Sequence, residues 1–452
     1  MTAPSRPKTR MWLRSPLAIL ADNAAGGLVI EGDVIVECLA SGQHPSAPVD
    51  ITFDASSHVV TPGLINTHHH FYQTLTRAHP VAINKALFPW LVSLYPVWAR
   101  LDEDAMRVAS ELALTELLLS GCTTAADHHY VFPKGLENAV DMQVDAAQKV
   151  GMRMTISRGS MNLSKKDGGL PPDSVVQDED VILADSERVL NRYHDRSPGA
   201  QIQIALAPCS PFSVDKTLMQ RSAELAERFD CTLHTHLAET LDENDYCESH
   251  YGCRPVDLLE ETGWLQARTW LAHGIHFTDE EIGKLGRHQV GISHCPTSNA
   301  VLASGFCPVR SLQAAGAPVG LGVDGSASSD SSNLMEAVRH ALMMARLRDS
   351  DAEATTHKDA LRLATEGSAA CLRRDDIGTI APGKQADLAL YALNDLRFSG
   401  AQDALAALVL CGAHHADRVM IAGQWKVVDG LPIHIDLNEL RARHAIAAAR
   451  FA

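Results

Sequence analysis

The sequence predicts an α/β protein whose main part is a (β/α)8 barrel, accompanied by a small β-sandwich built from both ends of the chain. Eight short apolar segments are separated by stretches long enough for helices, which is typical of a parallel sheet. Eight such units over about 250 residues are typical of a closed barrel. Short β-like runs flank these units on both sides, which indicates a second, smaller unit.

The expected barrel strands alternate with helical segments. Residues 103–120 and 222–228 are expected to be helical, and the first of them places apolar side chains at helical spacing. Four strands are expected near His68, His236, His273 and Asp324, and four others at residues 123–127, 152–157, 202–207 and 290–295. Functional groups of such barrels gather at the carboxyl ends of the strands, so we expect the functional site there.

The two ends of the chain carry the remaining β-like runs. They lie at residues 27–31, 34–37, 387–391, 418–421 and 426–428. We therefore expect three parts: residues 1–62 as the N-terminal part of the sandwich, residues 63–378 as the barrel, and residues 379–452 as the C-terminal part of the sandwich with a terminal helix.

The first site element is a run of three histidines after an apolar segment. Alternate residues of a strand point to the same side, so His68 and His70 should face one point while His69 faces the opposite side. Two neutral imidazoles at one point are half of a divalent metal site. Taken alone, the run is equally compatible with a surface cluster or with hydrogen-bonded core histidines.

Three further apolar segments end in the same way. One carries His236, followed three residues later by Glu239, another ends at His273, and the last ends at Asp324. The spacing of His236 and Glu239 suits a strand that turns at its end and brings a carboxylate back over the site. Each segment alone is a weak signal, but the four together predict a metal site at one end of the barrel.

These segments resemble motifs of the amidohydrolase superfamily, in the branch that contains guanine, cytosine and S-adenosylhomocysteine deaminases. The similar motifs are Pro-Gly-Leu-Ile-Asn-Thr-His-His-His at 62–70, His-Leu-Ala-Glu at 236–239, Ala-His-Gly at 272–274, His-Cys-Pro-Thr-Ser-Asn at 294–299, Gly-Val-Asp-Gly at 322–325, and the segment 378–388. Residues 123–130 and 207–213 are most similar to bacterial 8-oxoguanine deaminases. The resemblance covers nearly the whole chain.

The resemblance implies a single divalent metal ion, zinc or alternatively iron. Its ligands would be His68, His70, His236 and Asp324. Members with two metal ions carry a bridging lysine at the end of the fourth strand, whereas residues 206–209 of this chain contain none. We therefore expect one ion, which would make water a nucleophile at neutral pH.

The resemblance also implies hydrolytic deamination of a nucleobase. Asp324 would take a proton from the attacking water, and Glu239 would protonate a ring nitrogen and then assist the departure of ammonia. His273 would orient the attacking oxygen or polarise the attacked carbon without being a ligand.

Gln73 and Cys209 are the expected substrate contacts. The amide of Gln73 can donate and accept hydrogen bonds at the edge of a base, although a polar loop residue without contact is an equal alternative. Guanine deaminases of this branch often place an arginine after the fourth strand, where this chain has Cys209 and Ser210. We therefore expect 8-oxoguanine as the substrate, giving urate and ammonia, with isocytosine or guanine as further substrates.

Some residues near these motifs have plainer interpretations. We expect His69, His128, His129 and His234 to be packing or supporting groups. His294 could be structural or could contact the site. At least one of Trp90 and Trp98 should belong to the core, and the long loop at residues 158–180 is a candidate lid over the substrate.

Two alternatives to a nucleobase deaminase stay open. A triazine aminohydrolase or chlorohydrolase of the same branch would keep the fold and the metal, but Glu239 favours an amine as leaving group because chloride leaves without a proton. A non-catalytic metal-binding scaffold is the other alternative. The Pro-Cys-x-x-Cys motif of other zinc deaminases and the His-Glu-x-x-His motif of zincins do not occur in the sequence.

Composition indicates a cytoplasmic enzyme that acts on a small molecule. The formal net charge of −16 argues against a nucleic-acid partner, since binding phosphates needs a basic face. No run reaches the roughly 18 apolar residues of a membrane span, so no membrane association is expected. The ten scattered cysteines suit reduced thiols. Similar proteins are often dimers or larger, and we expect a homo-oligomer.

Overall fold

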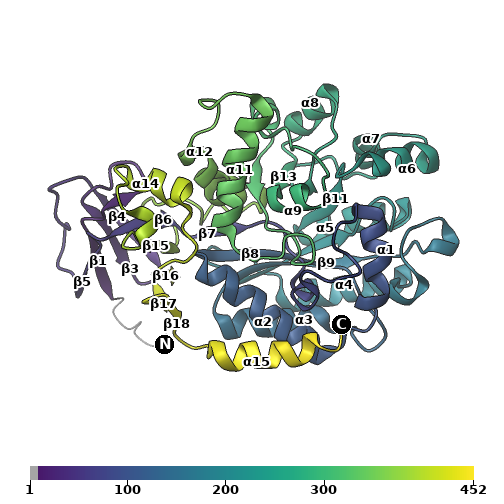
Figure 1. The fold of residues 1–452 in the computed structure, drawn as a ribbon, viewed down its shortest axis with the longest axis horizontal. Coiled ribbons are helices and arrows are strands. Elements are labelled where there is room, and N and C mark those ends of the chain that lie inside the picture. The colour runs from purple at the N-terminus through teal and green to yellow at the C-terminus, as the bar shows by residue number, and fades with distance from the viewer. Residues whose placement is uncertain (1–8) are drawn as a thin grey trace.

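A closed barrel of parallel strands forms the centre of the molecule (Figure 1). The computed structural model describes residues 9–452, and the first eight residues of the expected N-terminal part lie outside that range. The barrel strands pair in the order β10-β11-β12-β13-β14-β7-β8-β9. Their bounds are β7 (Leu64–Asn66), β8 (Cys122–His129), β9 (Arg153–Ser160), β10 (Ile202–Pro208), β11 (Thr232–Leu237), β12 (Thr269–His273), β13 (Gly291–His294) and β14 (Val319–Leu321). The predicted fold class is confirmed.

Helices α1 to α10 lie between successive barrel strands, and α11 to α15 follow the last of them. Their bounds are α1 (Leu87–Trp98), α2 (Glu103–Leu119), α3 (Ala139–Val150), α4 (Glu179–Tyr193), α5 (Lys216–Phe229), α6 (Leu241–Tyr251), α7 (Pro255–Glu261), α8 (Asp279–Arg287), α9 (Pro296–Val301), α10 (Val309–Ala315), α11 (Leu334–Asp349), α12 (His357–Arg362), α13 (Ser368–Cys371), α14 (Ala404–Ala407) and α15 (Leu437–Ala448). Helix α5 begins six residues before the predicted segment because the side chain of Asp215 caps it, accepting a hydrogen bond from the amide of Leu218. No helix within residues 9–452 is both long and apolar enough to cross a membrane.

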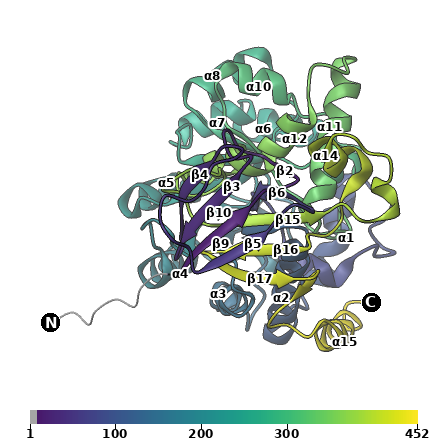
Figure 2. The same ribbon diagram turned by 90° about the vertical axis from the view of Figure 1, so that its left-hand side faces the viewer.

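Both ends of the chain build two further sheets beside the barrel. One sheet has the order β4-β3-β1-β5 and the other the order β18-β17-β16-β15-β6-β2. Their bounds are β1 (Arg10–Arg14), β2 (Ala18–Ile19), β3 (Gly27–Glu31), β4 (Val34–Leu39), β5 (Ile51–Asp54), β6 (His58–Pro62), β15 (Leu388–Ala392), β16 (Arg418–Ile421), β17 (Gln424–Val428) and β18 (Leu431–Pro432). Figure 2 shows the purple N-terminal strands in front of the yellow C-terminal ones, and a shared apolar core joins the two sheets as a sandwich.

Two barrel strands are shorter than the sequence pattern indicates. β7 ends at Asn66 and β14 at Leu321, so His68, His70 and Asp324 lie in the loops just beyond them. The side chain of Asn66 holds these loops in place. Its amide nitrogen donates to the carbonyl of Ala126, and its oxygen accepts a hydrogen bond from the amide of Val323. Side-chain hydrogen bonds thus replace the ladder where the segments that carry His68, His70 and Asp324 leave the sheet.

Helix α15 packs along α2, as Figure 1 shows, and it also contacts the short 3-10 helix that follows His70. His444 of α15 contacts the hydroxyl of Thr74 at 3.1 Å, and Arg443 pairs with Glu111 of α2. Thr74 belongs to the short 3-10 helix η1 (Phe71–Thr76), which follows His70 directly. The predicted terminal helix therefore supports the site from the outside of the barrel.

Candidate active site

A cavity opens at the carboxyl ends of the barrel strands. Its lining includes His70, His236, Glu239, His273 and Asp324, together with the two predicted substrate contacts, Gln73 and Cys209. His68 lies directly beneath this surface and is fully buried. Every residue that the sequence singled out for the site is thus brought to one place, although the histidines and Asp324 come from segments as much as 256 positions apart.

A chain of hydrogen bonds fixes the tautomer of His68. The carbonyl of Trp270 can only accept, so Nδ1 of His234, 2.8 Å away, carries the hydrogen. Burial holds the pKa of His234 well below its ordinary value, so its Nε2 is an acceptor. Nδ1 of His68, 2.7 Å from that Nε2, must therefore donate, which leaves a lone pair on Nε2 of His68. The hydrogen bond to His234 therefore directs Nε2 of His68 into the site.

The same reasoning applies to His70 and His236. Nδ1 of His70 lies 2.7 Å from the carbonyl of His128, and Nδ1 of His236 lies 2.7 Å from the carbonyl of Cys209. Burial lowers the pKa of His236 to about 3, so this ring is neutral near pH 7. Both carbonyls can only accept, so Nδ1 of each ring carries a hydrogen, and Nε2 of each ring points to the site.

Four electron-pair donors thus converge. The Nε2 atoms of His70 and His236 are 3.2 Å apart, and Oδ1 of Asp324 lies 3.3 Å from Nε2 of His68 and of His70. Burial raises the pKa of Asp324, but the two adjacent histidines outweigh this and hold it well below its ordinary value. Lone pairs at this separation repel one another unless a cation lies between them. Three imidazole nitrogens and one carboxylate are a suitable donor set for a divalent metal such as zinc.

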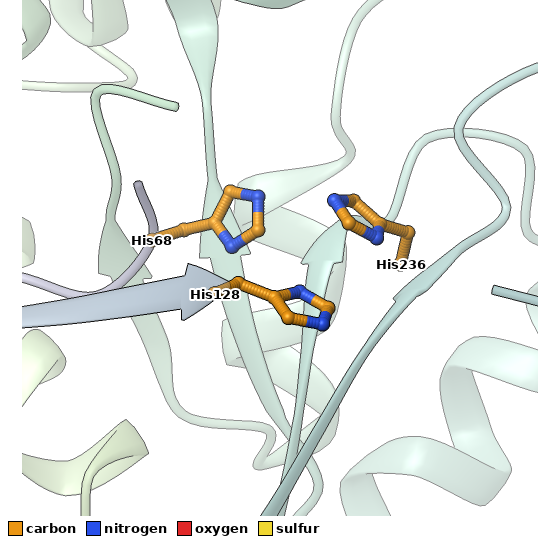
Figure 3. Close-up of side chains that lie close together, drawn as sticks. All are labelled: His68, His128 and His236. Atoms are coloured by element: carbon orange, nitrogen blue, oxygen red, sulfur yellow. The ribbon is translucent and has the colours of Figure 1, made fainter. Parts of the chain in front are cut away.

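Figure 3 shows His68, His128 and His236, which also approach one another. Their nitrogens all lie within 4.8 Å of one another, and the same holds for ligand atoms of His68, His273 and Asp324. Nε2 of His128 contacts the carbonyl of Ala207 at 2.9 Å, and its ring stacks on His236 with centroids 4.8 Å apart. His128 therefore acts as a packing partner of His236, as the sequence suggested.

Glu239 and His273 lie next to each other in the wall of the cavity. Oε2 of Glu239 lies 3.4 Å from Nε2 of His273, and the hydroxyl of Ser304 lies 3.4 Å from Oε1 of Glu239. Burial raises the pKa of Glu239 above its ordinary value. Burial lowers the pKa of His273, but the carboxylates of Glu239 and Asp324 outweigh it, so the net shift is upward. Such an acid and imidazole can exchange protons with a bound molecule.

Two supporting residues were not anticipated from the sequence. Asn299 accepts a hydrogen bond from Nδ1 of His273 at 3.0 Å and thereby directs its Nε2 into the cavity. Glu243 accepts hydrogen bonds from the amides of Ala238 and Glu239 at 2.7 and 3.3 Å, which holds the turn that carries Glu239. Glu243 lies four residues after Glu239, and Asn299 is the last residue of the His-Cys-Pro-Thr-Ser-Asn motif. Both positions are close to recognised motifs, but the sequence does not indicate their contacts.

The two predicted substrate contacts both reach the cavity. Oε1 of Gln73 accepts a hydrogen bond from the amide of Ala327 at 3.3 Å, so its Nε2 is left as a donor. Burial raises the pKa of the Cys209 thiol to about 12. Cys209 is therefore a neutral wall residue and not a nucleophile.

The loop that was predicted to be a lid does not form the wall of the cavity. None of residues 161–178 lines the cavity; this loop packs behind the wall, where the amide of Leu170 donates to the carbonyl of Phe212. Arg158 belongs to the core and pairs with Asp185 at 2.8 Å. Helix α1 forms the wall instead.

Trp90, Trp98 and His294 lie in three different surroundings. Trp90 of α1 lines the cavity, whereas Trp98 is fully buried and its indole nitrogen donates to the hydroxyl of Thr76. One of the two tryptophans is thus a core residue, as expected. His294 borders a separate apolar pocket behind α9.

The chain is similar to known proteins in sequence and in fold. The amidohydrolase family pattern matches residues 59–426. The chain is 60% identical over 444 residues to the 8-oxoguanine deaminase of Pseudomonas aeruginosa, which covers 98% of this chain and 99% of that protein. It is 38% identical over 345 residues to the hydroxydechloroatrazine ethylaminohydrolase of Pseudomonas sp. strain ADP, covering 75% and 71% of the two chains. The crystal structure of atrazine chlorohydrolase from Arthrobacter aurescens TC1 complexed with zinc superimposes with a TM-score of 0.91 at 30% identity, covering 97% of this chain and 100% of that one.

Proposed function

This chain belongs to the amidohydrolase family, and we propose that it is a metal-dependent deaminase that hydrolyses 8-oxoguanine to urate and ammonia. The near full-length similarity to a deaminase of that base carries the proposal. The site is compatible with it, because the cavity joins a set of metal donors to a buried acid and to an amide that can bind the edge of a base.

His68, His70, His236 and Asp324 would hold the divalent metal, for which zinc is our first choice. When bound, such an ion supplies Lewis acidity, which makes water a nucleophile near neutral pH. The hydrogen bonds of the three Nδ1 atoms fix the rings before any ion arrives, so the donors need not reorganise on binding.

The remaining steps belong to side chains of the cavity. Asp324 accepts a proton from the water that adds to C2 of the base. Glu239, whose raised pKa favours the protonated acid, gives its proton to the adjacent ring nitrogen. His273 holds the adding oxygen through Nε2, the nitrogen that Asn299 leaves free. The proton on Asp324 then passes to the amino group, the C2–N bond breaks and ammonia leaves, while the hydroxyl on C2 gives its proton back to Glu239 and becomes the carbonyl of urate.

The test is ammonia release by the metal-loaded protein from 8-oxoguanine, guanine, isocytosine, cytosine and an aminotriazine. Fast release from 8-oxoguanine and slow release from guanine is the expected result. Turnover of the triazine alone would instead support the second candidate, a triazine aminohydrolase, which the similarity to the hydroxydechloroatrazine enzyme favours. No ammonia release from any of the five compounds would refute both candidate functions.

A further inference from the structure

Two polar groups of the cavity wall make no hydrogen bond within residues 9–452. They are the hydroxyl of Tyr95 on helix α1 and Nε2 of Gln73. Both side chains line the cavity, and both are almost completely buried. A buried polar group without a partner destabilises the fold, so proteins seldom keep one without a reason.

The fold gains nothing from the Tyr95 hydroxyl that phenylalanine would not supply. Tyr391 is the contrast: it is equally buried, but its hydroxyl donates to the carbonyl of Ser120 at 2.9 Å. The ring of Tyr95 packs edge-on against Trp98 at 6.1 Å, and this contact needs no oxygen. The missing partner of the hydroxyl is therefore expected in the cavity itself.

The two donors come from different segments of the chain. Gln73 packs against Gly325, the neighbour of Asp324. Tyr95 comes from α1, which contributes the apolar part of the wall with Leu87, Trp90 and Leu91. A ligand that satisfies both must therefore carry two acceptors.

On the basis of the proposed function, we propose that Tyr95 donates a hydrogen bond to the C8 oxo group of the substrate and that this contact selects the oxidised purine over guanine. C2 and C8 are opposite ends of a purine. With C2 placed beside Asp324 and Glu239, the far end of the base would point to α1, which also lines the cavity. Gln73 would serve the C6 oxo group, which lies near C2 and is common to both bases. Guanine presents a C–H at C8 and leaves the Tyr95 hydroxyl unpaired, a loss that sites of this kind use for strong discrimination.

The test is Tyr95→Phe, with kcat/KM measured for 8-oxoguanine and for guanine, and with the Ki of guanine as competitive inhibitor measured in parallel. We expect kcat/KM for 8-oxoguanine to fall about 10- to 100-fold, while both guanine values change less than about threefold. The Tm should not fall, because the hydroxyl has no partner to lose.

Tyr391→Phe is the matched control. It removes a paired buried hydroxyl far from the cavity, so it should lower the Tm and leave the ratio of the two kcat/KM values unchanged. Equal losses on both bases, or no loss on either, in Tyr95→Phe would overturn the inference. A wild-type protein inactive on 8-oxoguanine would refute the proposed function itself, and the inference with it.

Discussion

Replacing Glu239 with glutamine tests the proton transfer on which the proposed reaction depends. The two side chains have the same shape, so the contact with the hydroxyl of Ser304 can be kept. The amide that replaces the carboxyl has no proton to give at neutral pH. Glu239 is only 3% exposed, so bulk water cannot readily take over its role.

The size of the effect follows from this geometry. Positioned general acids and bases contribute about 10²–10⁴ in rate, and the exclusion of water places Glu239→Gln in the upper half of that range. We expect kcat to fall roughly 10³- to 10⁴-fold, or about 4–5.5 kcal/mol of activation free energy. The KM should change much less, because the shape of the cavity is retained. The metal content should stay that of the wild type, since no proposed ligand is altered.

The assay is ammonia release under saturating substrate, with metal content and Tm measured on the same preparation. Glu281→Gln is a suitable control: this carboxylate is also buried, but it pairs with Arg254 at the start of α8, outside the cavity. It should lower the Tm and leave kcat near the wild-type value. Near-normal kcat in Glu239→Gln would refute the assignment of the proton shuttle.

Three further substitutions address the metal donors and the wall. Asp324→Asn should lower the metal content at least tenfold and abolish turnover, and a metal-replete, active variant would remove Asp324 from the site. His234→Phe keeps the stacking on Trp270 but removes the acceptor for Nδ1 of His68, so competition with a chelator should show about 10- to 100-fold weaker metal binding. In Gly325→Ala the new Cβ would lie 1.9 Å from Oε1 of Gln73, so the KM should rise several-fold with little change in metal content; an unchanged KM would contradict a substrate contact for Gln73.

The barrel and the convergence of its histidines could be predicted because both follow from topology. Strands that alternate with helices form a parallel sheet, and the carboxyl ends of its strands meet at one face. His236 and His273 were therefore expected beside each other without knowledge of any contact. His69 was also expected on the opposite side, and its Nε2 lies 2.8 Å from the hydroxyl of Ser332, away from the donors.

The supporting contacts could not be predicted, because they depend on register between distant segments. His234 meets His68 across 166 residues, and the tautomer of His68 depends on that one contact. The position of α1 is equally inaccessible, since its periodicity shows a buried face but not which end of the barrel it covers. For the same reason residues 158–180 looked like a lid, whereas hydrogen bonds to the segment around Phe212 hold them behind the wall.

The backbone is strained at three residues of the site, which indicates that the protein fixes the geometry of the site in advance. Ala238, His273 and Asp324 have φ values of 54°, 71° and 65°, in the left-handed region that side chains other than glycine seldom adopt. Each lies at or just beyond the end of a barrel strand, where the chain must turn sharply to present a side chain to the cavity. Such strain costs about 1–3 kcal/mol per residue and persists only where neighbours hold it. Glu243 does so for Ala238, and the hydrogen bond from the amide of Gly325 to Oδ1 does so for Asp324. Because the fold bears this cost, Asp324, His273 and the turn that carries Glu239 stand ready before an ion or a substrate binds, which is the preorganisation that an efficient hydrolase requires.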